Sequence, residues 1–161
     1  MTTTQLDAPT LRSALAGMAT PVVVVTTTVG GRHYGFTANS FTSVSMEPPL
    51  LGVYLAETAS SYDAFMAADR IAFNVLAHDQ GQVARQFATS GIDKFAGLAL
   101  SEELPDVPAL AGTMVTLAGT VHDRVVIGDH VLLLATPTEA TSLGSSPLVY
   151  HRRDFYRLGA S

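Results

Sequence analysis

The chain has 161 residues, of which 47% are hydrophobic and 14% are charged, and its formal net charge is −5. This length favours a single domain over residues 1–161, with a core from about residue 11 to about residue 158. The composition excludes a disordered chain, and the negative net charge provides no general attraction for nucleic acid.

The N-terminal part of the sequence predicts a helix followed by a β-hairpin. Apolar residues at helical spacing predict a helix over 10–18, with Thr10 as its N-cap. The β-branched run at 22–28 is typical of a strand. The Gly-Gly pair at 30–31 is a turn signal, so we expect a returning strand over 33–41.

The middle of the chain predicts two helices among buried strands. Strands are expected at 50–56 and 71–76, with a short helix at 60–68 between them. A longer helix is expected at 80–89, where Asp79 stands at a variant of the capping-box spacing.

The last third of the chain returns to β structure after a proline-containing loop. We expect strands at 114–126, 131–136, 148–150 and 155–158. Pro137 cannot donate to a ladder, so the strand that reaches it is expected to be interrupted or at a sheet edge. Many strands, three helices and no regular βαβ alternation favour a mainly β fold, a β-barrel with helices, over a doubly wound sheet.

Several classes of site and segment are excluded or disfavoured. The chain has no cysteine, so disulfides, thiolate metal sites and cysteine nucleophiles are excluded. It carries no Rossmann fingerprint, P-loop or G-x-S-x-G elbow, and its widely spaced histidines lead us to expect no metal. No apolar stretch reaches the ~18–20 residues of a membrane helix, and no export signal is recognisable, so we expect a cytoplasmic protein. The low charged fraction favours a homodimer that covers apolar surface.

The most informative stretch is GFTANSFTSVSMEPP at 35–49, which is rich in hydroxyl and amide side chains. Its polar residues are Thr37, Asn39, Ser40, Thr42, Ser43 and Ser45. Such a row suits a neutral heteroaromatic ring together with a polyol or a phosphate. It equally suits a hydroxyl-rich edge strand whose side chains bond to their own backbone. The residues by themselves leave both interpretations open.

Four blocks in order carry a resemblance to a known family: GFTANSFTSVSMEPPL at 35–50, TASSYDAF through FNVLA at 58–77, FATSGIDKFAG at 87–97, and GDH at 128–130. The chain resembles the flavin reductase domain of two-component flavin-dependent monooxygenase systems. The resemblance implies a homodimeric Greek-key split barrel that binds FMN, or FAD, near the dimer interface. It also implies hydride transfer from NADH or NADPH to the flavin, and supply of reduced flavin to a partner monooxygenase. A flavin-retaining oxidoreductase acting on a small organic substrate, or a non-catalytic flavin-binding protein, stays an alternative.

The resemblance also implies which residues meet the flavin. Thr37, Ala38, Asn39 and Ser40 would line the isoalloxazine edge, and Ser43, Val44 and Ser45 would follow the ring and the ribityl chain. Ser60, Ser61 and Lys94 would serve the phosphate, with Phe95 packing nearby. Other readings remain for two of these sites: one of the serines as a helix N-cap, and Lys94 as a solvated surface residue.

Several further positions complete the expected site. Phe87 is included as a possible wall, although its place in the predicted helix favours a core role. His130, the catalytic candidate, would lie where the nicotinamide stacks on the flavin and would position it; the same histidine is otherwise an exposed turn residue. Tyr150, and Arg152 or Arg153, would border the same pocket.

Overall fold

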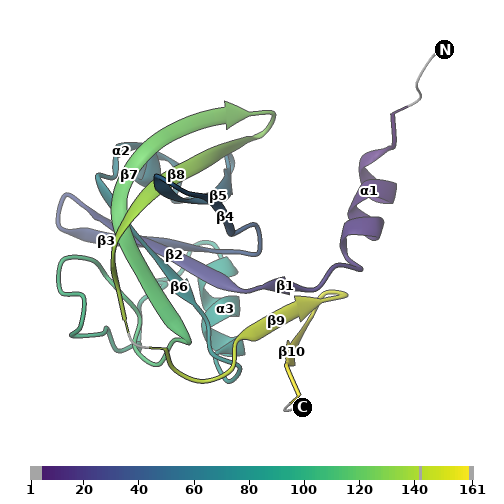
Figure 1. Cartoon of the computed structure of the whole chain (residues 1–161). Coiled ribbons are helices and arrows are strands. Elements are labelled where there is room, and N and C mark those ends of the chain that lie inside the picture. The colour runs from purple at the N-terminus through teal and green to yellow at the C-terminus, as the bar shows by residue number, and fades with distance from the viewer. Residues whose placement is uncertain (1–4, 142, 160–161) are drawn as a thin grey trace.

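The computed structural model describes residues 5–141 and 143–159 and consists of antiparallel β structure with short helices (Figure 1). In chain order the elements are α1 (Ala8–Leu15), β1 (Thr20–Pro21), β2 (Val23–Val29), β3 (Arg32–Ala38), β4 (Thr42–Met46), β5 (Pro49–Ala56), α2 (Tyr62–Ala67), β6 (Arg70–Val75), α3 (Gly81–Ala88), β7 (Val115–Ile127), β8 (His130–Ala140), β9 (Leu148–His151) and β10 (Asp154–Arg157). The prediction of a mainly β fold is confirmed.

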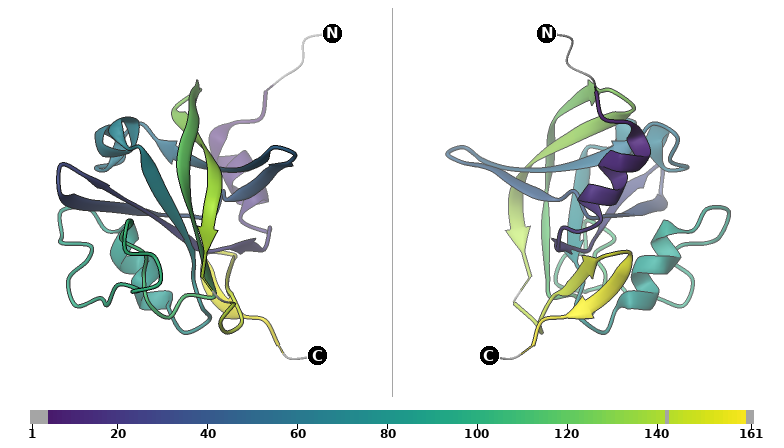
Figure 2. Two further views of the ribbon diagram at one scale, coloured as in Figure 1. Left: turned by 60° about the vertical axis from the view of Figure 1, so that its left-hand side comes forward. Right: turned by 90° about the vertical axis from the view of Figure 1, so that its right-hand side faces the viewer.

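Seven strands form one antiparallel sheet in the order β3-β2-β6-β7-β8-β5-β4, and a small sheet has the order β1-β9-β10. The long strands β7 and β8 curve strongly, so the large sheet bends round on itself (Figure 2). Its two ends meet beside the link between β3 and β4, where the Ser40 hydroxyl accepts a 3.1 Å hydrogen bond from the backbone N–H of Tyr54 in β5. The result is a barrel that is only partly closed.

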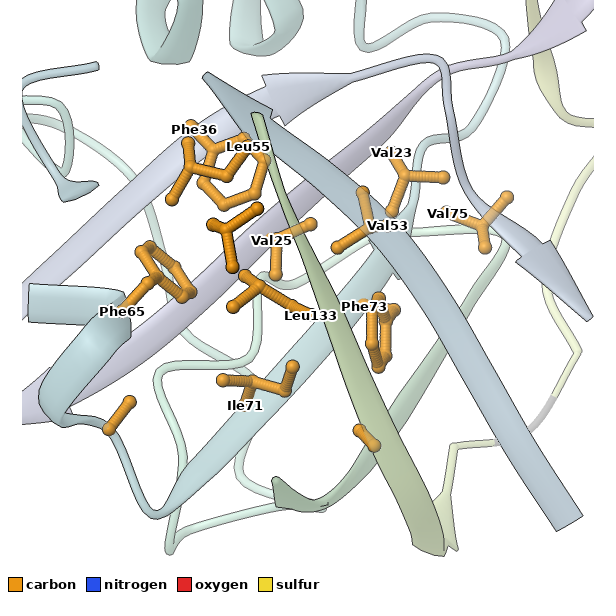
Figure 3. Close-up of a cluster of buried hydrophobic side chains, with 13 residues drawn as sticks. Val23, Val25, Phe36, Val53, Leu55, Phe65, Ile71, Phe73, Val75 and Leu133 are labelled. Carbon is orange, nitrogen blue, oxygen red and sulfur yellow. The ribbon is translucent and has the colours of Figure 1, made fainter. Parts of the chain in front are cut away.

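Four valines follow one another at 22–25, and the last three of them begin β2. Val23 and Val25 point into the main core of the barrel, which Figure 3 shows together with Phe36, Phe65 and Phe73. Val22 and Val24 belong instead to a second cluster, which packs under α3 around Phe87 and Leu148. Because both faces of this part of the strand are covered, its apolar residues do not alternate with polar ones.

The first helix differs from its prediction in position and in burial. It begins at Ala8 because the Asp7 carboxylate caps it, accepting a 2.8 Å hydrogen bond from the backbone N–H of Thr10. Thr10 is therefore inside the helix and is not its cap. None of the residues of α1 is buried, and its apolar face stays exposed, with Leu11 46% and Leu15 53% accessible.

Two other local predictions are wrong for identifiable reasons. Asp79 does not cap α3, because the N-cap is Gln80, whose side-chain oxygen instead accepts from the backbone N–H of Ala77. The returning strand expected over 33–41 stops at Ala38, and a separate strand, β4, follows. The polar link between the two turns the chain from one edge of the sheet to the other.

Pro137 lies in β8, an interior strand of the large sheet, and the expected interruption of the strand is found there. Strand β8 runs between β7 and β5, and its register against β7 shifts where Gly119 pairs with Pro137. Pairing with β5 has already ended at Ala135. The proline thus lies at a bulge, past the end of the pairing with β5. Its missing backbone N–H therefore leaves no acceptor on β5 without a partner.

Candidate functional site

A hollow of about 480 Å³, here called the central hollow, opens where β3, β5, α3 and the start of β8 come together. It is lined by residues 36–40, 54–56, 58–60 and 87–88, together with Ser90, Lys94 and His130. Residues from three of the sequence blocks, those at 35–50, 58–77 and 87–97, therefore line one space. His130, from the fourth block, lines it too. Its volume is in the range typical of small-molecule sites.

The segment from Thr37 to Ser40 forms one wall of the central hollow, but its polar groups have different tasks. The hydroxyl of Thr37 donates a 2.7 Å hydrogen bond to the backbone oxygen of Ala84 in α3. The Ser40 hydroxyl is occupied by Tyr54 across the barrel opening. Asn39 is exposed, and within the described part of the chain its side chain makes no hydrogen bond. Asn39 is thus the side chain of this wall that is free to meet a ligand.

His130 also lines the central hollow. It is the first residue of β8, pairs with Ala56 of β5, and is half-buried. Its Nδ1 lies 2.7 Å from a carboxylate oxygen of Asp129, and this contact holds the pKa of the Asp129 carboxyl below its usual range. With Nδ1 engaged by the carboxylate, Nε2 is the nitrogen available to a ligand.

Lys94, which lines the central hollow, binds two backbone carbonyls. Its ammonium nitrogen donates to the oxygen of Phe87 over 2.8 Å and to that of Gly35 over 3.1 Å. Desolvation by burial lowers the pKa of this half-buried ammonium group. An ammonium carries three N–H donors, so one is left for an anion.

A second hollow, of about 830 Å³, continues from the first and shares Ser60 and Lys94 with it. This outer hollow also contains Ser61, Phe95 and the basic side chain of Arg32. Ser61 is only 4% exposed, and among the described residues its hydroxyl oxygen has no hydrogen-bond partner. Because a buried hydroxyl without a partner is costly, the combination favours a polar or anionic ligand group at this place.

The structure separates some of the predicted residues from this site. Ser43, Val44 and Ser45 lie on β4, an edge strand, and line neither the central nor the outer hollow. Phe87 is fully buried in the second core cluster, so its ring serves the core while it also backs the central hollow. Tyr150 lines a neighbouring hollow and not the one that contains His130.

Other lining residues were not predicted from the sequence. Strand β5 contributes Tyr54, Leu55 and Ala56, which reach the site because β5 pairs with β8. Nothing in the run LLGVYLA distinguishes such residues from ordinary core. Thr58 and Ala59 could have been predicted as lining residues, because they directly precede Ser60 in the second block.

Two features are absent from the part of the chain that the structure describes. Over residues 5–141 and 143–159, side chains of histidine, aspartate and glutamate do not gather in groups of three or more that would hold a metal ion. No helix in the same ranges is long and apolar enough to cross a membrane.

Comparison with known proteins identifies the family. The family model described as "Flavin reductase like domain" matches residues 15–159. The chain belongs to this family. The resemblance seen in the sequence is confirmed.

Individual relatives agree with this membership. The NADH:riboflavin 5′-phosphate oxidoreductase of Streptomyces pristinaespiralis is 42% identical over 149 residues, covering 90% of this chain and 85% of the relative. The reductase component of the flavin-dependent trigonelline monooxygenase of Acinetobacter baylyi is 38% identical, covering 91% of this chain but only 47% of that longer protein. The NADH:FAD oxidoreductase SgcE6 of Streptomyces globisporus, solved with NAD and FAD fragments, has a TM-score of 0.86 at 31% identity and covers 97% of this chain and 98% of SgcE6.

Proposed function

We propose that this protein is an NAD(P)H-dependent flavin reductase that passes hydride from a reduced nicotinamide to FMN, or FAD, and supplies the reduced flavin to a partner monooxygenase. One observation carries the proposal: in a chain of this family, Asn39, His130 and Lys94 come from distant segments and surround one hollow. The names of the relatives, which include NADH:flavin oxidoreductases and a monooxygenase reductase component, support the same reaction class.

The donor set of the two connected hollows fits a flavin mononucleotide. Backbone and side chain at 37–40 would meet the polar edge of the ring. The unpartnered Ser61 hydroxyl and the remaining N–H of Lys94 would hold the phosphate, with Ser60 beside them. When bound, the flavin supplies a hydride acceptor, and the protein contributes position and charge.

His130 would position the nicotinamide. Hydride transfer itself needs no proton donor, and the imidazole is fixed by Asp129 on one nitrogen. A half-buried ring at the edge of the central hollow can orient a second ring through its free nitrogen. Because rates depend steeply on approach geometry, such an orienting contact contributes more to rate than to affinity.

We also propose that two copies of the chain assemble through α1. The amphipathic helix carries two exposed apolar side chains, Leu11 and Leu15, and Met18, which follows the helix, is exposed as well. A helix with an apolar face and no buried residue gains stability by packing against a second surface. The cytoplasmic location expected from the sequence stays a prediction.

The function is tested by measuring NADH and NADPH oxidation with and without added free FMN. A reductase that releases its flavin turns over only with free FMN, and its rate saturates with FMN. Turnover that needs a different organic acceptor would instead support a protein that retains its flavin. FMN binding without any oxidation of either nicotinamide would contradict the proposal and leave a flavin-binding protein.

A further inference from the structure

A third hollow, of about 400 Å³, adjoins the central hollow and shares Thr37, Ala38, Asn39 and Ala88 with it. Its outer side is formed by the β9–β10 hairpin and α3, so we call it the hairpin hollow. The hairpin contributes two aromatic rings, Tyr150 and Phe155, whose centroids lie 5.7 Å apart. A ligand that reaches from the central hollow past Asn39 would therefore enter an aromatic-walled space.

The charge of the hairpin hollow is entirely positive. Arg85 of α3 and Arg153 of the hairpin line it, and none of the described residues that line it is acidic. The Arg85 guanidinium lies over the Phe155 ring, 4.8 Å from its centroid, and neither arginine forms a salt bridge within the described residues. The nearby Asp154 carboxylate instead accepts a 2.8 Å hydrogen bond from the backbone N–H of Phe155. Two unpaired guanidinium groups in a chain of net charge −5 favour a doubly charged anion.

The backbone that presents Arg153 is strained. The two-residue turn between β9 and β10 places Arg152 at φ 48° and Arg153 at φ 66°, a left-handed conformation that favours glycine or asparagine. The N–H of Arg152 donates a 2.8 Å hydrogen bond to the backbone oxygen of Ala16, which anchors the turn beside α1. Backbone strain of this kind is concentrated at functional sites, and here it occurs at a residue that lines a hollow.

We infer that the hairpin hollow binds the adenosine diphosphate part of the reduced pyridine dinucleotide, with Arg85 and Arg153 on the diphosphate and Tyr150 and Phe155 against the adenine. The inference rests on the proposed function, since it places the second half of the hydride donor. The shared lining at 37–39 allows the nicotinamide end to reach the central hollow, where His130 lies. Diphosphate and purine are the groups that paired guanidiniums and aromatic faces recognise.

The test uses the flavin-free protein and ADP-ribose, which carries the diphosphate and the adenosine but no nicotinamide. Calorimetric titration should show binding by the wild type. The variants Arg85→Gln and Arg153→Gln should each weaken it at least tenfold while FMN affinity changes less than twofold. With the active protein, ADP-ribose should compete with NADH and not with FAD. Competition with FAD alone would overturn the assignment, because the hairpin hollow would then bind the adenosine diphosphate part of FAD and not that of NADH.

A pair of glycine variants separates binding from folding. Arg153→Gly relieves the left-handed strain and removes the charge, so it should keep or raise the melting temperature while it weakens ADP-ribose binding at least tenfold. Arg152→Gly relieves strain equally but lies outside the lining of the hairpin hollow, so it should keep wild-type affinity. Equal affinity in both variants, or no ADP-ribose binding by the wild type, would overturn the inference.

The two proposals fail in different ways. If NADH oxidation depends on FMN but the arginine variants keep the wild-type KM for NADH, the inference is wrong and the reductase function stands. If no nicotinamide is oxidised but ADP-ribose still binds through both arginines, the reductase function is wrong and the diphosphate site stands.

Discussion

The ammonium nitrogen of Lys94 lies 2.8 Å from the backbone oxygen of Phe87, in the last turn of α3, and donates a hydrogen bond to it. A second bond to Gly35 connects the same group to β3. Gln86 completes the arrangement, because its side-chain amide donates to the backbone oxygen of Lys94 over 3.0 Å. The lysine therefore connects loop, helix and strand, and it keeps one N–H for a ligand at the junction of the central and outer hollows.

Replacing Lys94 should affect phosphate recognition more than ring recognition. A charge-assisted contact to a phosphate is worth roughly 1.5–3 kcal/mol, or about tenfold or more in affinity. We expect the wild type to prefer FMN over riboflavin, and Lys94→Ala to lose most of that preference and some thermal stability. Fluorescence titration with both flavins measures it. A preference that survives intact would leave the phosphate to Ser60 and Ser61.

The same lysine should give the preference a pH dependence. Burial lowers the pKa of Lys94, so the unfolded chain holds this proton more tightly than the folded one. Charged Lys94 thus costs folding stability at neutral pH, and the cost diminishes as pH rises from the folded pKa towards the ordinary value. A bound phosphate favours the charged form, so the preference for FMN should decline as pH rises through the pKa of Lys94. Lys94→Met should show no such decline.

His130→Ala should slow reduction by the nicotinamide at least about tenfold, roughly 1.4 kcal/mol of barrier, with FMN affinity nearly unchanged. Single-turnover reduction of bound FMN by NADH and by NADPH measures this rate directly. Asp129→Asn is the matched control: its carboxylate is 93% exposed, so it should change the rate less than the histidine does. If the variant reduces flavin at the normal rate but binds it poorly, His130 contacts the flavin and does not position the nicotinamide.

Asn39→Ala and Ser40→Ala should each weaken FMN binding by about two- to tenfold, for different reasons. Asn39 is exposed and free, so its loss should leave stability unchanged. Ser40 accepts from the N–H of Tyr54 and holds the wall in place, so its loss should also lower stability by about 1 kcal/mol. Urea unfolding beside FMN titration separates the two. Unchanged affinity in both variants would mean that the ring lies elsewhere.

The buried side chain of Asn74 should be the most sensitive polar position. Its amide nitrogen donates to the oxygen of Val24 over 2.9 Å and to the Thr26 hydroxyl over 3.0 Å, while its oxygen accepts from the N–H of Leu110 and from the Thr116 hydroxyl. Asn74→Ala leaves several buried groups unpaired, so we expect it to lower the free energy of unfolding by about 3 kcal/mol. A loss below about 1 kcal/mol would show that water replaces these bonds.

Dimer assembly should depend on the exposed face of α1. Sedimentation of the wild type is expected to show a dimer at micromolar concentration. Leu15→Glu places a charge in the proposed interface and should shift the equilibrium to monomer, because an unpaired charge is costly to bury. The control Gln82→Glu adds the same charge on the exposed side of α3 and should leave the dimer intact. A fully active monomer would contradict this assembly.

Local chemistry determined much of this protein before any contact was known. The β-branched run of β2, the Gly30-Gly31 turn and the absence of Rossmann and P-loop motifs predicted a β-rich fold of one domain. The order of the four blocks indicated the family, and the resemblance predicted Asn39, Lys94 and His130 as site residues. These features depend on backbone preferences and on residue type, and both can be read along a chain.

Only the tertiary structure decided how each of these residues is used. It turned the hydroxyls of Thr37 and Ser40 towards Ala84 and Tyr54, and it gave Lys94 two carbonyls to bind before any ligand. It placed Ser43, Val44 and Ser45 on an edge strand and Tyr150 in the hairpin hollow with Arg85 and Arg153. These outcomes depend on which strands and helices are neighbours in space. That choice minimises exposed apolar surface and unpaired polar groups over the whole molecule, so no local stretch of sequence contains it.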